Sequence, residues 1–194
     1  MSTDNATGSI SATESLAAIL VGGRSRRFGS DKSTYLWNSK PLWRHVADAV
    51  SPLELPIVLA CSEPKAIVDN PFPVIYDLQP YQGPLVSLLS LFKQSQARNI
   101  LVLACDMPLV KPPVLQLLCQ PSPNAIQLLE NGNGLAPLPG LYRRDCIKTL
   151  QQLINKGQRR MKDLLESNLP ISIIAEAEWM QIDPLKQSIV NVNQ

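Results

Sequence analysis

The stretch of residues 16–32 restricts the fold more than any other part of the chain. It opens with six apolar residues, Leu-Ala-Ala-Ile-Leu-Val, and then reaches the pair Gly22-Gly23. A continuous apolar run of this length is typical of a strand that is buried on both faces of a parallel sheet. Because glycine has no Cβ, the backbone can turn tightly after the strand and approach a ligand closely. Residues 16–21 therefore predict a buried strand that leads into a binding loop.

The loop after this strand has the properties of an anion site. Consecutive backbone N–H groups in a glycine-rich turn form a concavity for anions, and four cations follow the glycines, namely Arg24, Arg26, Arg27 and Lys32. The loop does not match the dinucleotide fingerprint G-x-G-x-x-G. Nor does it match a P-loop, which needs a lysine directly after its last glycine. We therefore expect a polyphosphate ligand that is held by a different kind of loop.

The composition favours one globular domain. Of the 194 residues, 45% are hydrophobic and 18% are charged, which is sufficient for a core without metals or disulfides. Residues 1–15 are mostly polar, so we predict a disordered tail there and a folded domain over residues 16–194. The net charge of +2 is too small to predict binding to a nucleic acid.

The spacing of the cysteines and the hydropathy pattern indicate the cellular compartment of the protein. The four cysteines have no C-x-x-C spacing and lie in apolar surroundings, which favours buried, reduced thiols. The apolar runs are too short for a membrane helix, and the N-terminal tail does not resemble a signal peptide. We therefore expect a cytoplasmic protein without membrane contact.

Strands and helices alternate in the first half of the chain. Apolar runs at residues 57–61, 74–76 and 100–105 predict three further strands. Helices are predicted to begin at Pro41 and Pro84, because proline suits the first helical turn, and a short helix or turn is predicted at residues 64–69. This alternation predicts an α/β protein with a three-layer α/β/α, Rossmann-like arrangement and a mostly parallel sheet.

The second half is predicted to be less regular. Its expected elements are helices at residues 112–119, up to Gly157 and at 158–166, extended segments at 125–130 and 135–142 on either side of a turn at Asn131-Gly132, and edge strands or loops at 171–174 and 179–182. The one histidine, His45, falls on the first helix, where a structural role is the more common one.

Ligands of parallel α/β sheets bind at the carboxyl ends of the strands. This rule places the cationic loop, Asp77 and Asp106 at one edge of the sheet, although they are far apart in the sequence. Asp106 is either solvated at the end of its strand or coordinates a cation, and Asp77 either caps a helix or belongs to the ligand site. Mg²⁺ takes one or two carboxylates together with waters and phosphate oxygens, so a single aspartate can suffice.

Several stretches resemble motifs of nucleotidyltransferases that use a nucleoside triphosphate and release pyrophosphate, particularly the molybdenum cofactor guanylyltransferase family. Residues 20–32 resemble its L-A-G-G-x-x-R-R-M-G-x-D-K motif, with Val21 in place of Ala and Phe28 in place of Met. The other matching stretches are residues 77–85 (D-x₅-G-P-L), 105–108 (C-D-x-P), 137–144 (P-L-x-A-L-Y-R-R), 157–160 (G-x-R-R) and 191–193 (N-x-N).

The resemblance implies a nucleotidyltransferase fold and a specific reaction. The family transfers GMP from GTP to the phosphate of molybdopterin, or of its molybdenum-bearing form, and so makes the guanine dinucleotide form of the cofactor with Mg²⁺. Transient contact with molybdenum-insertion proteins or molybdoenzyme chaperones is a further implication. Two alternatives remain open: a CTP-dependent transferase that acts on molybdopterin or a sugar phosphate, and a catalytically weak carrier of a nucleotide or pterin.

The resemblance also implies roles for individual residues. Lys32 and Asp106 would be catalytic, with Asp106 as the magnesium ligand. The nucleotide would contact Leu20, Val21, Gly22, Gly23, Arg24, Lys32, Asp77, Gly83 and Asp106. The pterin side would comprise Arg159, Arg160, Asn191 and Asn193, and the Arg143-Arg144 pair would also suit a substrate phosphate, although surface helix charges commonly explain such pairs.

The chain departs from the family pattern at two further places. Gln194 follows the N-x-N stretch without the usual T-P-x-D-L helix, so the positions of Asn191 and Asn193 need not match those of the family. Ala60 and Ser62 stand after the second apolar run, where the family usually has Asn.

Overall fold

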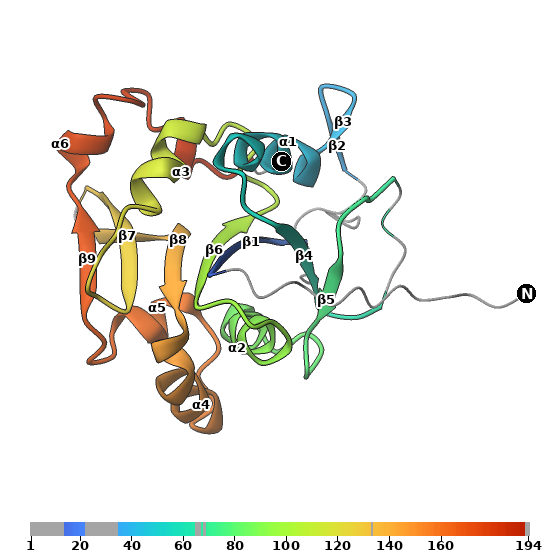
Figure 1. Cartoon of the computed structure of the whole chain (residues 1–194), viewed down its shortest axis with the longest axis vertical. Coiled ribbons are helices and arrows are strands. Elements are labelled where there is room, and N and C mark those ends of the chain that lie inside the picture. The colour runs from blue at the N-terminus through green and yellow to red at the C-terminus, as the bar shows by residue number, and fades with distance from the viewer. Residues whose placement is uncertain (1–13, 22–34, 65–66, 68, 133, 193–194) are drawn as a thin grey trace, which may run out of the picture.

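The computed structural model describes residues 14–21, 35–64, 67, 69–132 and 134–192. In these residues seven strands form one sheet in the order β5-β4-β1-β6-β8-β7-β9, and helices cover both of its faces (Figure 1). The strands are β1 Ser15–Leu20, β4 Ile57–Cys61, β5 Val74–Tyr76, β6 Asn99–Ala104, β7 Ile126–Asn131, β8 Gly134–Arg143 and β9 Ile171–Ile174. The α-helices are α1 Leu42–Val50, α2 Pro84–Gln94, α3 Pro112–Leu118, α4 Ile147–Asn155, α5 Met161–Leu165 and α6 Glu176–Trp179. The three-layer α/β prediction is confirmed.

The sheet separates two hydrophobic cores. Leu16 and Ala18 of β1 pack into the core that contains residues of α2, α4 and α5. Ala17 and Ile19 point the other way, into the core that contains residues of α1, α3 and α6. Because helices cover both faces of the sheet, side chains on either side of a central strand are buried and apolar residues are favoured at every position. This explains why β1 and β6 are continuous apolar runs in the sequence.

Strand direction defines two edges of the sheet. β1 pairs in parallel with β4 and β6, β4 with β5, and β7 with β9, whereas β8 runs antiparallel to β6 and β7. We call the edge at which the parallel strands end the carboxyl edge, and the opposite edge the amino edge. β8 runs toward the amino edge, where its last residue Arg143 pairs with Asn99, the first residue of β6.

The segment before α1 differs from the prediction. Pro41 does not begin a helix; it pairs with Leu36 in a small antiparallel hairpin of β2 (Leu36–Trp37) and β3 (Lys40–Pro41), and α1 begins at Leu42. Asn38 and Ser39 both have positive φ angles, of 50° and 63°, as a tight two-residue hairpin turn requires. His45 contributes to this packing as expected, because its Nε2 lies 2.8 Å from the Trp37 carbonyl oxygen.

Two other segments bear on the prediction. One adopts one of its two predicted alternatives, and the other differs from the prediction in part. Between β4 and β5 the described residues form a turn rather than a helix, with the Asn70 N–H donating to the Ile67 carbonyl at 3.3 Å. The predicted edge strand or loop at residues 179–182 is wrong in part, because Trp179 ends α6. The Trp179 side chain is fully buried and its Nε1 donates to the Glu130 carbonyl at 2.9 Å, which holds a helical turn against β7.

The domain boundary lies slightly before the predicted residue 16. Ser15 begins β1, and the Glu14 carbonyl accepts hydrogen bonds from the backbone N–H groups of Arg98 and Asn99 at 3.0 Å each. These bonds attach Glu14 to the start of β6, so the last residue of the predicted tail belongs to the sheet and the residue before it is bonded to the sheet. Residues 1–13 lie outside the described residues. In the described part of the chain, every helix is too short or too polar to cross a membrane.

Candidate active site at the carboxyl edge

The end of β1 lies between the ends of β4 and β6. The Val21 N–H donates to the Ala60 carbonyl at 2.9 Å, and the Cys105 N–H donates to the Leu20 carbonyl at 3.1 Å. The chain leaves β1 toward β4 by way of α1 and reaches β6 from β5 by way of α2, and these helices cover opposite faces. Open α/β sheets bind ligands at such a reversal of strand order. Leu20 and Val21 therefore lie at the carboxyl edge, next to Ala60 and Cys105, and their contact with a nucleotide stays a prediction.

The glycines and cations of the predicted phosphate loop, Gly22, Gly23, Arg24 and Lys32, lie outside the described residues. Their roles stay predictions. The described residues fix where the loop starts, directly after Val21, whose side chain is buried in the core beneath the carboxyl edge.

Asp106 follows β6 and is 5% exposed. The Nδ2 atom of Asn191 donates to Oδ1 of Asp106 at 3.3 Å, and the Val192 N–H donates to the Asp106 carbonyl at 2.8 Å. The C-D-x-P and N-x-N stretches therefore meet at the carboxyl edge. Asn193, the other predicted asparagine, lies outside the described residues.

Asp77 follows β5 at the same edge and is also buried. The Ser87 hydroxyl, in the first turn of α2, donates to its Oδ2 atom at 3.0 Å. Burial raises the pKa of Asp77 to about 6, although hydrogen bonds from Ser87 and Ser62 lower it. Asp77 is thus held by α2 and by the segment after β4, and it changes charge close to neutral pH.

The two aspartates are too far apart to share one cation. β4 and β1 lie between β5 and β6, which makes three interstrand steps. At about 4.8 Å per step, the ends of β5 and β6 are roughly 14 Å apart. Asp77 and Asp106 therefore mark two ends of an elongated site.

Gly83 joins two of the motifs. Its φ angle is +94°, and a Cβ at this position would lie 2.9 Å from the carbonyl oxygen of Arg159. That oxygen also accepts the N–H of Leu85 at 3.3 Å. The G-P-L stretch thus packs directly on the G-x-R-R stretch, and glycine is required at position 83 for both its backbone angle and its closeness to Arg159.

The two predicted pterin-side arginines have different environments. Arg159 Nη1 donates to the carbonyls of Ile154 and Gln158 at 2.6 and 2.8 Å, and its Nε donates to Gln82 Oε1 at 3.2 Å. These bonds close the end of α4 and hold it to the segment before Gly83. Arg160 forms an ion pair of 3.0 Å with the buried Asp163, while its own side chain is 78% exposed. Arg160 is therefore the one of the pair whose guanidinium faces solvent.

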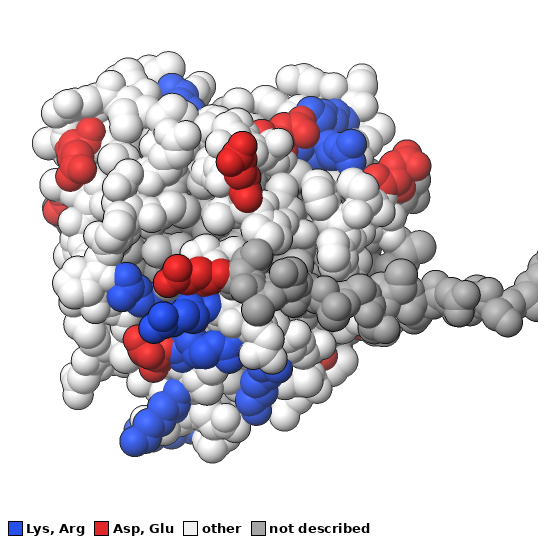
Figure 2. All heavy atoms as spheres, viewed as in Figure 1, with Lys and Arg blue, Asp and Glu red and all other residues white. Residues whose placement is uncertain are grey.

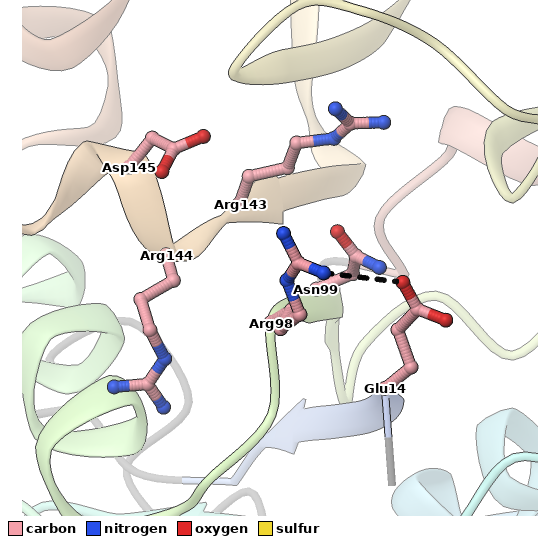
Figure 3. Close-up of a pocket in the computed structure, with 6 residues that line it drawn as sticks. All are labelled: Glu14, Arg98, Asn99, Arg143, Arg144 and Asp145. Atoms are coloured by element: carbon pink, nitrogen blue, oxygen red, sulfur yellow. Dashed lines mark ion pairs between the residues drawn. The ribbon is translucent and has the colours of Figure 1, made fainter.

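The predicted role of the Arg143-Arg144 pair at a substrate phosphate is wrong. Because β8 is antiparallel, it carries these residues to the amino edge, and Arg143 lies about 20 Å from Asp106, at roughly 3.3 Å per residue along β6. They line a pocket of about 130 Å³ there with Glu14, Arg98, Asn99 and Asp145 (Figure 3). Arg144 points away toward α2 and donates to the carbonyls of Ala97 and Ser95 at 2.9 and 2.7 Å. These arginines do not belong to the site at the carboxyl edge.

Two features outside the motifs were not anticipated. Ser87 supports Asp77, and a serine in a first helical turn is too common to stand out in a sequence. Ser62 stands out in the sequence only as a departure from the family pattern. Among the cysteines, Cys61, Cys105 and Cys146 are buried thiols as predicted, whereas Cys119 is half-buried. Figure 2 shows basic and acidic side chains interspersed around α4 and α5, without a surface of one sign on the face in view.

The fold and the carboxyl edge together are typical of α/β proteins that bind a ligand where the strand order reverses. A family model described as "MobA-like NTP transferase domain" matches residues 17–171. The chain therefore belongs to the MobA-like NTP transferase domain family.

Curated relatives and a solved structure agree with this assignment. A "Probable molybdenum cofactor guanylyltransferase" of Chloroflexus aggregans (strain MD-66 / DSM 9485) is 29% identical over 90% of this chain and 87% of that protein. A protein of the same name from Geobacillus sp. (strain WCH70) is 30% identical over 75% of this chain and 78% of that one. The crystal structure of molybdopterin-guanine dinucleotide biosynthesis protein A from Archaeoglobus fulgidus has the same fold, with a TM-score of 0.80, 24% identity and 92% of each chain covered.

Proposed function

We propose that this chain transfers GMP from GTP to the phosphate of molybdopterin, or of its molybdenum-bearing form, and releases pyrophosphate. Family membership and the names of the relatives support this reaction. The observation that carries it is the meeting of distant motifs at one edge. Leu20 at the end of β1 bonds Cys105, which directly precedes Asp106, Asn191 reaches Asp106, and Gly83 packs on Arg159.

The reaction needs no covalent nucleophile from the protein. An oxygen of the pterin phosphate attacks the α-phosphorus of GTP and forms a new phosphoanhydride bond. The bond from that phosphorus to the bridging oxygen of the β-phosphate breaks, and its electron pair leaves with pyrophosphate. The protein contributes orientation of the two phosphates and stabilisation of the negative charge that develops on them. We assign Lys32 and the amides of Gly22 and Gly23 to the triphosphate.

The separation of the two aspartates suits an extended nucleoside triphosphate. We place the phosphates at the Asp106 end, beside the start of the loop after Val21, and the nucleoside at the Asp77 end, near Gly83. Arg160 and Asn191 then remain for the pterin phosphate and pterin ring. Asp77, with a pKa of about 6, can accept a hydrogen bond as a carboxylate or donate one as an acid.

A divalent cation, which we propose is Mg²⁺, fits the residues present. Among the described residues no cluster of three or more His, Cys, Asp or Glu side chains could enclose a metal ion. Mg²⁺ does not need such a cluster, because it keeps several waters and takes substrate phosphate oxygens with one or two carboxylates. Asp106 would hold it, and when bound it would neutralise charge on the phosphates. Asp77 is excluded as a second ligand of the same ion by the separation of roughly 14 Å between their strands.

Pyrophosphate release from each of the four common nucleoside triphosphates, with and without molybdopterin, tests the proposal. We expect release from GTP that depends on molybdopterin and on Mg²⁺. A preference for CTP would instead identify a cytidylyltransferase, and tight binding without release would identify a carrier. Lys32→Ala should weaken GTP binding by roughly 1.5–3 kcal/mol, the value of one charge-assisted hydrogen bond.

The setting of the reaction follows from the same proposal. Buried thiols such as Cys61, Cys105 and Cys146 suit a reducing compartment, and we place the protein in the cytoplasm. Exchange of substrate and product with molybdenum-insertion proteins or molybdoenzyme chaperones stays a prediction.

A further inference from the structure

The C-terminal residues 183–192, which we call the C-terminal strap, lie along the loop that connects β6 to α3. The strap contacts both ends of this loop. At one end, Asn191 and Val192 donate hydrogen bonds to Asp106, as described above. At the other end, the Lys111 N–H donates to the Ser188 hydroxyl at 3.1 Å, and Lys111 Nζ lies 2.9 Å from Asp183 Oδ1. The loop that carries Asp106 is therefore bound at both ends by the strap.

Asp183 organises the far end. Its side chain is completely buried, as is that of Ser188. One carboxylate oxygen faces Lys111 Nζ, and the other accepts the Ser188 N–H at 2.6 Å. Burial alone would raise the pKa of Asp183, but the Lys111 ammonium and the groups of Ser188 hold it below its usual range. One buried charge thus fixes the strap to the loop eight residues before Asn191.

The near end has little packing of its own. Val190 is 42% exposed and Asn191 is exposed, so burial of these side chains does not determine where the Asn191 amide lies. Its position depends on the bond from the Val192 N–H to the Asp106 carbonyl and on the anchor at Asp183 and Ser188. An amide that donates to a metal-binding carboxylate fixes the orientation of that carboxylate, and such partners affect metal affinity and activity without touching the metal.

We propose that Lys111 and Asp183 are positioning residues for the transfer reaction. Their buried ion pair anchors the C-terminal strap, and through Asn191 the strap holds the Asp106 carboxylate in its working orientation. This inference rests on the proposed function only in that Asp106 is taken as the reactive carboxylate. It assigns Asn191 to Asp106 in addition to any contact with the pterin.

Hydrogen exchange measured by mass spectrometry tests the anchor without any substrate. In Asp183→Asn we expect faster exchange in the peptides that cover the strap and in those that cover residues 105–111. The matched control is Lys162→Met, which breaks the exposed Lys162–Glu166 pair and should leave both regions unchanged. If Asp183→Asn does not fold, Ser188→Ala removes the acceptor of the Lys111 N–H and the hydroxyl bond to Asp183 but keeps the Lys111–Asp183 ion pair, and it should act in the same direction to a smaller extent. Exchange of residues 105–111 that stays at the wild-type rate while the strap is released would overturn the proposal.

Turnover tests whether the anchor acts through Asn191. We expect Asp183→Asn to lower kcat by about 10- to 100-fold and to raise the Mg²⁺ concentration that gives half of the maximal rate, as the loss of an outer partner of a metal ligand does. The KM for GTP should change less. Asn191→Ala should lower kcat as well. The double variant should be no slower than the slower single variant, because both substitutions disrupt the same support of the Asp106 carboxylate.

The outcomes separate this proposal from its alternatives. If the two substitutions multiply in kcat, or if Asn191→Ala raises only the KM for molybdopterin, then Asn191 serves the pterin and the strap does not position Asp106. If the wild-type protein releases no pyrophosphate from GTP, the proposed function fails. The exchange measurement still decides whether the strap holds the Asp106 loop.

Discussion

The two edges of the sheet carry similar side chains and differ in what surrounds them. At the carboxyl edge, Asp77 and Asp106 are buried and held by hydrogen bonds from distant parts of the chain. At the amino edge, the acids and arginines of the small pocket include the exposed pair of Glu14 and Arg98, whose charged atoms are 3.9 Å apart. Hydrogen bonds thus fix the two carboxylates at the carboxyl edge, whereas solvent screens the Glu14–Arg98 pair at the amino edge.

The contrast teaches that strand direction decides which motif joins a site. Residues 137–144 resemble the family pattern, with Gly140 in place of Ala, and residues 157–160 match it fully. However, β8 runs antiparallel and delivers Arg143 to the amino edge, and α4 then returns the chain to Gly157 and Arg159 beside Gly83. A sequence match locates a residue in the chain, and the topology locates it in space.

The largest effect is expected from Asp106→Asn, which removes the charge at the carboxyl edge and keeps the size of the side chain. Metal Lewis acidity is worth several kcal/mol of transition-state stabilisation, so kcat should fall by roughly 100-fold or more. Excess Mg²⁺ should restore part of the rate, since a weakened site can be filled by mass action. Steady-state pyrophosphate release at several Mg²⁺ concentrations measures both effects.

Asp77→Asn is the control for this prediction. Because the ends of β5 and β6 are roughly 14 Å apart, the Mg²⁺ dependence of Asp77→Asn should match that of the wild type. A shift in Mg²⁺ dependence as large as that of Asp106→Asn would show that the two aspartates act on one ion, and the division of the carboxyl edge into two ends would be wrong.

The next effect concerns the contact between Gly83 and Arg159. Gly83→Ala should destabilise the protein by about 1–3 kcal/mol, because the backbone is held in a region that side chains rarely adopt and the Cβ meets a carbonyl oxygen. Gly157→Ala is a comparison without the clash, since its φ is also positive, at +82°, and its Cβ would have no neighbour within 4 Å. Urea unfolding should show a larger loss for Gly83→Ala than for Gly157→Ala. Equal losses would mean that the Arg159 carbonyl yields to the methyl group.

A smaller effect is expected in the pH dependence of stability. Burial raises the pKa of Asp77 to about 6 in the folded protein, against an ordinary value of 3.8. The folded state therefore binds this proton more tightly, so the contribution of Asp77 to stability is complete below about pH 4 and is lost as the pH rises through 6. Asp77→Asn does not titrate, so its free energy of unfolding relative to wild type should rise between pH 4 and pH 7 by up to about 2 kcal/mol, allowing for solvent screening. A constant difference over this range would place the pKa near its ordinary value.

Much of the fold could be predicted because the central strands are buried on both faces. The apolar runs that became β1, β4 and β6 have few other stable arrangements, and their ends identify the carboxyl edge. Prediction from the sequence was less successful where tertiary contacts determine the local structure. The helical turn that ends at Trp179 depends on a bond to Glu130, and the hairpin at Pro41 depends on two non-glycine residues that adopt positive φ.

The candidate site was predictable at its strand ends and less so between them. Asp77 and Asp106 stand directly after apolar runs, where the rule for parallel sheets applies. The partners that hold them come from a helix turn at Ser87 and from the strap at Asp183 and Asn191. No local pattern marks a serine or a lone aspartate as such a partner, because its role exists only once segments far apart in the chain meet.

The smallest effect on turnover is expected at the amino edge. Arg143→Ala should leave kcat and the KM values unchanged, because Arg143 lies about 20 Å from Asp106 along β6.

Arg144→Ala should also leave turnover unchanged but should lower the free energy of unfolding by about 1–2 kcal/mol, since its bonds to the carbonyls of Ser95 and Ala97 are lost. Its guanidinium also lies 5.7 Å from the centre of the Phe92 ring. Turnover assays and urea unfolding should therefore rank the variants of the two edges differently. Asp106→Asn should be inactive and folded, whereas Arg144→Ala should be active and less stable. A loss of turnover in folded Arg143→Ala would extend the site to the amino edge and remove the distinction between the two edges.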